Sequence, residues 1–384
     1  MITNGIFFKN FKIKKQNFNI KKKLNFLLKR KIPVLNSLSE NYKNNFDLKK
    51  IKKFKRFNNF RIFGMGGSSL GAEAIYNFLS NKIFKNFSFI NDLDISTRNR
   101  KDKNCLNLII SKSGETIETI VNSNILINRF EKNIFITENR KNYLHKLAQK
   151  LKADIIHHNN FIGGRYSVLS ETGMLPAELM GLDSKKFRQL NNLVRNKKYL
   201  NSLIANVESI IFFMTKKKNN SIILNFDKKS EGLCYWYQQL VAESLGKNKK
   251  GILPVVTNMP KDNHGVMQFY LDGLSNNFFT FFYVHENRSP KIKNELILSS
   301  KKYLKNKKLA DVIYSQKKAT ENVFNQKNIP FRSFEVFQRN EKTLGELFCF
   351  FILETILLGE AMKINPFDQP AVELIKKETK KILS

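Results

Sequence analysis

Acidic residues are scarce in this chain of 384 residues, where 32 Asp and Glu face 67 Lys and Arg and leave a formal charge of +35. No acidic residue precedes Glu40. Such a balance raises the hypothesis of a nucleic-acid partner. However, the basic residues are mostly Lys, spread along the chain among many Asn, Ile and Phe. We therefore interpret most of them as solvated surface residues and expect no specific nucleic-acid partner.

Residues 7–31 are rich in Lys, Asn and Phe but poor in Arg and Ser. A transit peptide is also poor in acidic residues, but it is rich in Arg and Ser. No apolar run followed by a small-residue cleavage site is present either. The sequence favours a basic N-terminal arm that belongs to the fold, with a targeting role as the alternative.

Cysteine is rare as well, with Cys105, Cys234 and Cys349 far apart and without paired spacing. This excludes a disulfide framework or a zinc knuckle and fits a reducing compartment, so we expect a cytoplasmic protein. The five histidines show no i, i+4 pair and no neighbouring Cys, so we expect no metal site. Among them, His264 stands in a polar turn, and taken singly such a residue is more often structural or solvated than catalytic.

Long apolar runs are also missing. The most apolar stretch, Leu347–Leu358, is interrupted by Glu354 and flanked by Glu346 and Glu360. It is shorter than the roughly 20 residues that span a bilayer. We predict a buried core helix there and no membrane partner.

What the sequence does contain is an alternation of strands and helices, over a length that suits about two domains. Residues 60–63, 107–110, 133–137 and 154–156 are typical of strands, with helical spacing between them. A second alternating block has strands at 221–226 and 278–284 and helices at 232–244 and 309–325. This pattern predicts an α/β fold of two domains, each a parallel sheet flanked by helices, and a helical C-terminal tail. The expected divisions are 1–50 for the basic arm, 51–184 and 185–343 for the two domains, and 344–384 for the tail.

Two polar turns follow strands, at the sheet edge where ligands of parallel sheets gather. The first turn, 64–69, includes Gly67 and Ser68, and glycines there let backbone approach a ligand closely. The second turn, 111–116, precedes a helix whose N-terminus suits a phosphate. It brings four candidate phosphate ligands, namely Ser111, Lys112, Ser113 and Thr116. An ordinary capping turn remains the alternative for this segment.

Three further segments carry candidate chemistry. Glu243 lies near the end of a largely apolar helix, where a carboxylate can act as a base. A surface Glu near a helix C-terminus is the alternative, although the helix dipole disfavours a negative charge there. Arg165 follows two glycines, which place a guanidinium near a ligand or in a structural ion pair. The last helix is expected to start at Pro370. Gln369 and Lys376 stand seven residues apart, about two helical turns, and are expected to share a face of that helix.

Together, and in this order, these motifs resemble the glucose-6-phosphate isomerase family from about Phe63 to Lys377. The segments that carry the resemblance are 64–68 (GMGGS), 111–116 (SKSGET), 163–167 (GGRYS), 243–247 (ESLGK), His264 and 367–373 (FDQPAVE). The resemblance implies two sugar-isomerase (SIS) domains, a homodimer, no cofactor and a proton-transfer mechanism.

The resemblance also implies a role for each candidate residue. Ser111, Ser113 and Thr116 hold the sugar phosphate with Lys112 nearby, while Gly67 and Ser68 line the same pocket. Glu243 carries the proton between C2 and C1, and Arg165 stabilises the enediolate. Lys376 and His264 open the sugar ring, with the histidine contributed by the partner subunit. Gln369 lies beside them in the pocket.

The chain departs from the family pattern in a shorter N-terminal region and at Glu171, Leu245 and Ala371. None of these departures removes a candidate catalytic group. Two related functions stay open, an isomerase that also accepts mannose 6-phosphate and a non-catalytic sugar-phosphate sensor. A sensor needs the phosphate turns but no base, so the joint presence of Glu243, Arg165, His264 and Lys376 argues against it.

Overall fold

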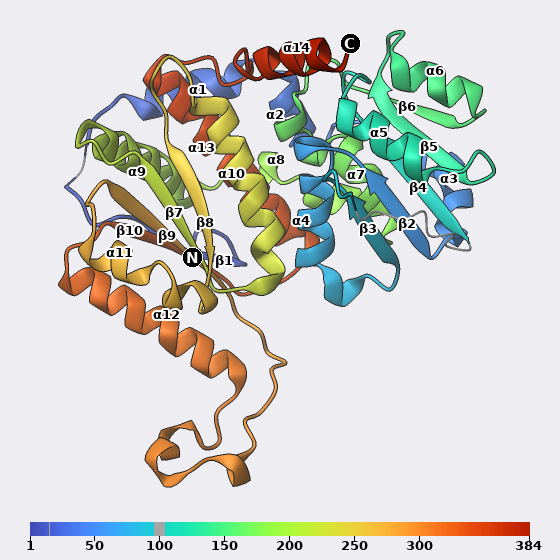
Figure 1. Cartoon of the computed structure of the whole chain (residues 1–384). Helices are drawn as coiled ribbons and strands as arrows, with labels where there is room; N and C mark the ends of the chain where they lie inside the picture. Colours follow the sequence, from blue (N-terminus) through green and yellow to red (C-terminus); the bar gives the residue numbers. More distant parts are fainter. Residues whose placement is uncertain (15, 96–103) are drawn as a thin grey trace.

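A computed structural model of the chain describes residues 1–14, 16–95 and 104–384. Within these residues the strands form two five-stranded sheets, with helices on their faces (Figure 1). The predicted architecture, two α/β domains and a helical C-terminal region, is confirmed. No helix of the described residues is long and apolar enough to cross a membrane.

The first sheet is wholly parallel and has the order β3-β2-β4-β5-β6. Its strands are β2 (Asn59–Phe63), β3 (Asn86–Ile90), β4 (Cys105–Ile110), β5 (Lys132–Glu138) and β6 (Asp154–His158). Every residue of the central β4 is buried. Burial on both faces explains its nearly continuous apolar sequence.

The second sheet has the order β1-β10-β9-β7-β8. Its strands are β1 (Ile6–Lys9), β7 (Asn220–Asn225), β8 (Leu253–Asn258), β9 (Asn277–Val284) and β10 (Phe331–Val336). Four are parallel, and β1 pairs antiparallel with β10, with Ile6 opposite Val336. The sequence analysis predicts no strand in this first segment, because four residues are too few to show a period.

The helices fill the connections and the termini. They are α1 (Ile20–Lys29), α2 (Pro33–Ser37), α3 (Leu48–Ile51), α4 (Leu70–Phe78), α5 (Ile117–Leu126), α6 (Tyr143–Lys150), α7 (Glu171–Leu179), α8 (Leu190–Leu193), α9 (Lys197–Thr215), α10 (Glu231–Leu245), α11 (Met267–Asp272), α12 (Leu309–Gln326), α13 (Glu341–Met362) and α14 (Val372–Leu383).

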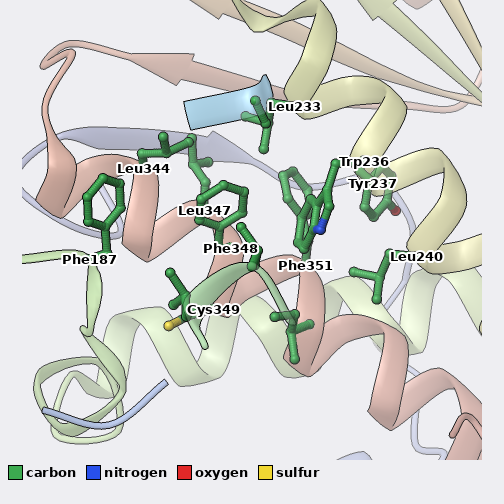
Figure 2. Close-up of a cluster of buried hydrophobic side chains, with 14 of the residues drawn as sticks. Phe187, Leu233, Trp236, Tyr237, Leu240, Leu344, Leu347, Phe348, Cys349 and Phe351 are labelled. Carbon is green, nitrogen blue, oxygen red and sulfur yellow. The ribbon is translucent and has the colours of Figure 1, made fainter. Parts of the chain in front are cut away.

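Helices α10 and α13 lie between the two sheets and form the centre of the core (Figure 1). Figure 2 shows their buried side chains together, with Trp236 edge-on to Phe348 at 4.8 Å between ring centroids. The rings of Tyr237 and Phe351 are tilted against each other, with 4.4 Å between centroids. Helix α13 contains the predicted core segment, and burial of its large apolar side chains stabilises the fold by about 1.5–3 kcal/mol each.

The last helix begins at Val372, so the expectation of a start at Pro370 is wrong. Pro370 and Ala371 form a turn, and Gln369 lies outside the helix, held by a hydrogen bond from Arg165. Gln369 and Lys376 therefore do not share a helical face. None of the residues of α14 is buried.

Candidate active site

The two polar turns meet at one edge of the first sheet. Strands β2 and β4 are neighbours, and each ends at one of the turns. Strand β3 lies on the other side of β2, so the chain order reverses between β2 and β4. Ligands of open α/β sheets bind at such a switch point, outside the carboxyl ends of the strands.

The turn after β4 offers hydroxyl groups and free amides. The Ser111 and Thr116 hydroxyls are 2.8 Å apart, and the Gly114 amide donates to Ser111 Oγ at 3.2 Å. Thr116 is the N-cap of α5, but its side chain makes no capping bond. The amides of the first turn of α5 consequently lack a side-chain acceptor, and a phosphate oxygen can fill that role.

Lys112 belongs to this turn but is partly engaged elsewhere. Its amine lies 3.4 Å from Glu138 Oε1, and the side chain is about a third exposed. Glu138 also pairs with Arg140 at 2.9 Å. Lys112 therefore supplies positive charge beside the turn while sharing a carboxylate with a second cation.

The turn after β2 is packed directly against the segment that carries Arg165. A Cβ atom on Gly67 would lie 2.2 Å from the carbonyl carbon of Gly164 and 2.5 Å from the Arg165 nitrogen. Only glycine allows this approach of two backbones. Gly67 therefore joins the first polar turn to the short helix η4 (Gly164–Leu169) and brings Arg165 to the same place.

Arg165 is 2% exposed, and its guanidinium donates in several directions. Nε donates to Ser244 Oγ at 2.7 Å, and Nη2 donates to the carbonyls of Pro366 at 2.7 Å and Asp368 at 3.0 Å. Nη1 donates to Gln369 Oε1. Arg165 thus links α10 to the segment between α13 and α14, which sequence alone separates by more than a hundred residues.

Glu243 lies beside this guanidinium, with Oε1 3.2 Å from Arg165 Nη1. Its other oxygen, Oε2, accepts a hydrogen bond of 3.0 Å from Gln239 Nε2. Gln239 precedes Glu243 by one helical turn and touches the first polar turn, where a Cβ on Gly66 would be 2.6 Å from Nε2. The sequence reasoning missed Gln239, although its i−4 spacing from the carboxylate places both on one face of α10.

A chain of hydroxyl groups supports the guanidinium from behind. Arg165 only donates and the Pro366 carbonyl only accepts, so the hydroxyls between them have a fixed direction. Ser244 accepts from Arg165 and donates to Tyr166 across 2.8 Å, and Tyr166 donates to Pro366 at 3.1 Å. Complete burial raises the pKa of the Tyr166 phenol, which keeps its proton available for this bond.

This arrangement can be set beside known proteins. A family model described as phosphoglucose isomerase matches residues 34–259. The chain belongs to the phosphoglucose isomerase family. The glucose-6-phosphate isomerase of Methanocaldococcus jannaschii is 33% identical to it over 335 residues, 82% of each chain. That of Streptococcus thermophilus is 31% identical over 358 residues, covering 82% of this chain and 78% of the relative.

Solved structures share the fold. A hypothetical protein of Thermus thermophilus superposes with a TM-score of 0.81 at 21% identity, over 95% of this chain and 94% of the other. A glucose-6-phosphate isomerase from Chlamydia trachomatis superposes with a TM-score of 0.76 at 13% identity, over 99% and 89%. The family model and the curated relatives confirm the family predicted from the sequence motifs.

In the structure most of the predicted site residues converge, but His264 does not. It is exposed in the short helix η7 (Lys261–His264), where Asp262 accepts from the Asn258 amide. Asn258 in turn bonds Glu231 in the first turn of α10. Glu243 lies twelve residues further along that helix, about 18 Å of helical rise. In a single chain, His264 is thus at the opposite end of α10 from Glu243.

Lys376 also lacks contact with the converging residues. Its amine forms an ion pair with Glu373 at 2.6 Å, and its side chain is 58% exposed on α14. An exposed pair at i, i+3 is weak, worth a few tenths of a kcal/mol. Lys376 is therefore free to exchange this partner for another.

Glu171, which departs from the family pattern, is fully buried at the start of α7. Its Oε1 accepts from the Tyr42 hydroxyl at 2.9 Å and the Asn45 amide at 3.1 Å, and His158 lies 3.5 Å from Oε2. Burial alone would raise the pKa of Glu171, but the hydrogen bonds from His158 and backbone amides lower it. This carboxylate ties the N-terminal region to the helix that follows Arg165.

Proposed function

We propose that the chain catalyses the reversible isomerisation of glucose 6-phosphate and fructose 6-phosphate. The observation that carries the proposal is the 3.2 Å contact between Glu243 and Arg165, a carboxylate and a permanent cation beside an uncapped hydroxyl turn. The names of the relatives from Methanocaldococcus jannaschii and Streptococcus thermophilus support the same reaction.

The phosphate group of the sugar binds at the turn after β4 in this proposal. Ser111, Ser113 and Thr116 donate hydroxyl hydrogens, and the first amides of α5 add their dipole. Lys112 contributes charge, at the expense of its pairing with Glu138. Gly67 and Ser68 form the facing wall, where the close packing of Gly67 on Gly164 brings Arg165 to the sugar.

The proton transfer uses Glu243 as the base. Glu243 removes the proton from C2 of the open-chain aldose, and the electron pair of that bond forms the double bond of the enediolate. The negative charge develops on the C1 oxygen, where Arg165 stabilises it without giving up its own proton. Glu243 then returns the proton to C1, while the hydroxyl proton of the C2 oxygen passes to the C1 oxygen, so that C2 becomes the ketone and C1 carries a hydroxyl group. Gln239 orients the Glu243 carboxylate, and Gln369 orients the Arg165 guanidinium.

Ring opening requires His264 and Lys376, which act as acid and base at the ring oxygen and the anomeric hydroxyl. His264 serves this role from a second copy of the chain, so we propose a homodimer. Support comes from its exposed position, about 18 Å along α10 from the base of its own chain. Three widely spaced, buried cysteines fit our proposal of a cytoplasmic location.

The test is a coupled assay of fructose 6-phosphate conversion by the purified protein and its Glu243→Gln variant. We expect the variant to lose about 10²–10⁴-fold in kcat, the usual contribution of a positioned base. Glu40→Gln, an exposed residue in the N-terminal region, removes the same charge and should leave kcat unchanged. Full activity in Glu243→Gln would refute the assignment of the base. Binding of sugar phosphate without turnover in the parent would favour a sensor.

A further inference from the structure

A second cavity lies at the edge of the second sheet opposite the carboxyl ends of its parallel strands. Its volume is about 290 Å³. It opens between the end of β1, the segment between α9 and β7, and the segment between α12 and β10. The lining residues are Lys9, Lys12, Ile13, Phe213, Lys218, Phe324, Asn325, Asn328, Ile329, Pro330 and Phe331. None of them belongs to the candidate active site.

The floor of this cavity is aromatic. Phe213, Phe324 and Phe331 are buried, with exposed fractions of 5% or less. The rings of Phe324 and Phe331 are 6.1 Å apart and edge-on. Side chains of Ile13 and Ile329 add apolar surface. Such a floor suits an apolar group, because apolar side chains release water when they are covered.

The rim is cationic, and no Asp or Glu lines the cavity. The Lys9 amine lies 4.8 Å above the Phe331 ring, and Lys218 donates to the Ser275 carbonyl. Lys9 and Lys218 are partly buried, and burial lowers the pKa of both amines.

These amines also lack a carboxylate of their own. In the part of the chain that the structure describes, Lys9, Lys12 and Lys218 form no ion pair. The Glu321 carboxylate acts on Lys9 by charge, but it already pairs with Lys317 at 2.8 Å and Lys318 at 3.3 Å. Bringing several uncompensated charges together is unfavourable, and an anion would relieve the repulsion.

We infer that this cavity binds a small organic anion, one that carries a phosphate, sulfonate or carboxylate head on an apolar body. The head would pair with Lys9, Lys12 and Lys218, and the body would cover the phenylalanine floor. A simple inorganic anion would pair only with the lysines of the rim, and a neutral ring would contact only the apolar side chains of the floor. The inference does not depend on the proposed isomerase reaction.

Phenyl phosphate combines both features and serves as the probe, with binding measured by isothermal titration calorimetry. We expect saturable binding of one molecule per chain at the cavity, at least tenfold tighter than inorganic phosphate alone or phenol alone. Binding should weaken as salt is raised, since the rim contributes by charge. Equal affinities for phenyl phosphate and inorganic phosphate would overturn the role of the floor.

Variants then locate the bound molecule. Lys9→Gln and Lys218→Gln should each weaken phenyl phosphate at least fivefold, whereas Lys217→Gln, an exposed neighbour outside the cavity, should change nothing. Lys112→Gln tests the hydroxyl turn of the first sheet, which is the other candidate anion site. Loss of binding in Lys112→Gln with retention in Lys9→Gln would overturn the proposal, as would equal binding by all four variants. Thermal melting of each variant in the absence of probe checks that it is folded.

Discussion

The first four parallel strands have the same order in the two sheets, but the chemistry at their carboxyl ends differs. In each sheet, the parallel strand that comes first in the chain lies between the second, which is at the sheet edge, and the third, which is toward the sheet centre. The resulting orders are β3-β2-β4 and β8-β7-β9. At the first switch point the structure has Ser111 and Thr116 hydroxyls and uncapped amides. At the second it has an ion-pair cluster, in which Arg339 bonds Asp227 at 2.9 Å and Glu286 at 2.7 Å.

This difference shows that a switch point in the sheet is not by itself enough to bind an anion. The side chains at the switch point decide whether an anion binds there. At the second sheet two carboxylates would repel a phosphate, and the single guanidinium is already neutralised by them. Arg339 also donates to the Phe78 carbonyl at 3.2 Å, at the end of α4 of the first domain. The first switch point is therefore suited to binding, while the second holds the two domains together.

The largest effect should come from breaking the second cluster. Arg339→Gln leaves Asp227 and Glu286 partly buried without their cation and removes the link to Phe78. We expect a loss of about 3 kcal/mol in the free energy of unfolding, measured by urea denaturation. The KM for fructose 6-phosphate should stay the same. Lys229→Gln removes an exposed amine 3.5 Å from Glu286 and should cost less than about 1 kcal/mol. A rise in KM for Arg339→Gln would contradict the conclusion that only the first switch point binds substrate, while the second holds the two domains together.

Acid should weaken the second sheet before the first. Burial alone would raise the pKa of Glu335 on β10, but hydrogen bonds from His285 and Lys317 hold it well below the usual value. A lowered folded pKa means that this carboxylate stabilises the fold above its unfolded pKa of about 4.3 and that the contribution falls as the pH drops below about 5. A tenfold difference in proton affinity between the folded and unfolded chain corresponds to about 1.4 kcal/mol. Hydrogen exchange at pH 7 and pH 4 should show β10 losing more protection than β4. Equal losses of protection in β10 and β4 would show that the buried ion pairs of Glu335 do not determine the acid sensitivity of the second sheet.

At the first sheet a smaller change should affect binding rather than stability. Thr116→Val keeps the shape of the side chain but removes the hydroxyl that faces Ser111. We expect KM for fructose 6-phosphate to rise about two- to tenfold, the value of one hydrogen bond, with an unchanged melting temperature. Thr320→Val on α12, whose hydroxyl bonds only the Gln316 carbonyl, is the matched control. The same rise in both variants would exclude a specific role for the turn.

The smallest effect should follow from Tyr166→Phe, which removes the end of the hydroxyl chain behind Arg165. The ring still packs against Phe367 at 5.6 Å, so we expect a stability loss of only about 0.5–1.5 kcal/mol. The guanidinium loses part of its support, and kcat should fall a few-fold while KM changes little. Tyr235→Phe on the exposed side of α10 should alter neither. An unchanged kcat would mean that Ser244 and the backbone carbonyls suffice to hold Arg165.

Local sequence patterns predicted those elements whose conformation depends on residues within the element itself. The glycine-rich turn, the hydroxyl turn and the helix of Glu243 are each marked by residue types whose behaviour is local, namely backbone freedom, capping and apolar spacing. Cys105–Ile110 is typical of a strand because burial on both faces requires apolar residues. These signals were enough to identify the family and the α/β architecture.

Other features depend on segments that are distant along the chain. Strand β1 exists because β10, more than 300 residues later, offers an edge. The role of Gln239 depends on Gly66 leaving room for its amide, and the pairing of Lys112 depends on Glu138 ending the neighbouring strand. Gln369 lies outside α14, which begins at Val372, and accepts a hydrogen bond from Arg165, a residue far earlier in the chain.

The sequence by itself therefore determined which chemical groups are present and the kinds of turns and helices that hold them, because those properties arise within a few residues. Only the tertiary structure decided which groups face each other. It brought Arg165 to Glu243, left His264 at the far end of α10, and placed an ion pair where the second sheet would otherwise have an anion site. Distances between side chains are set by packing across the whole chain, and no local pattern encodes them.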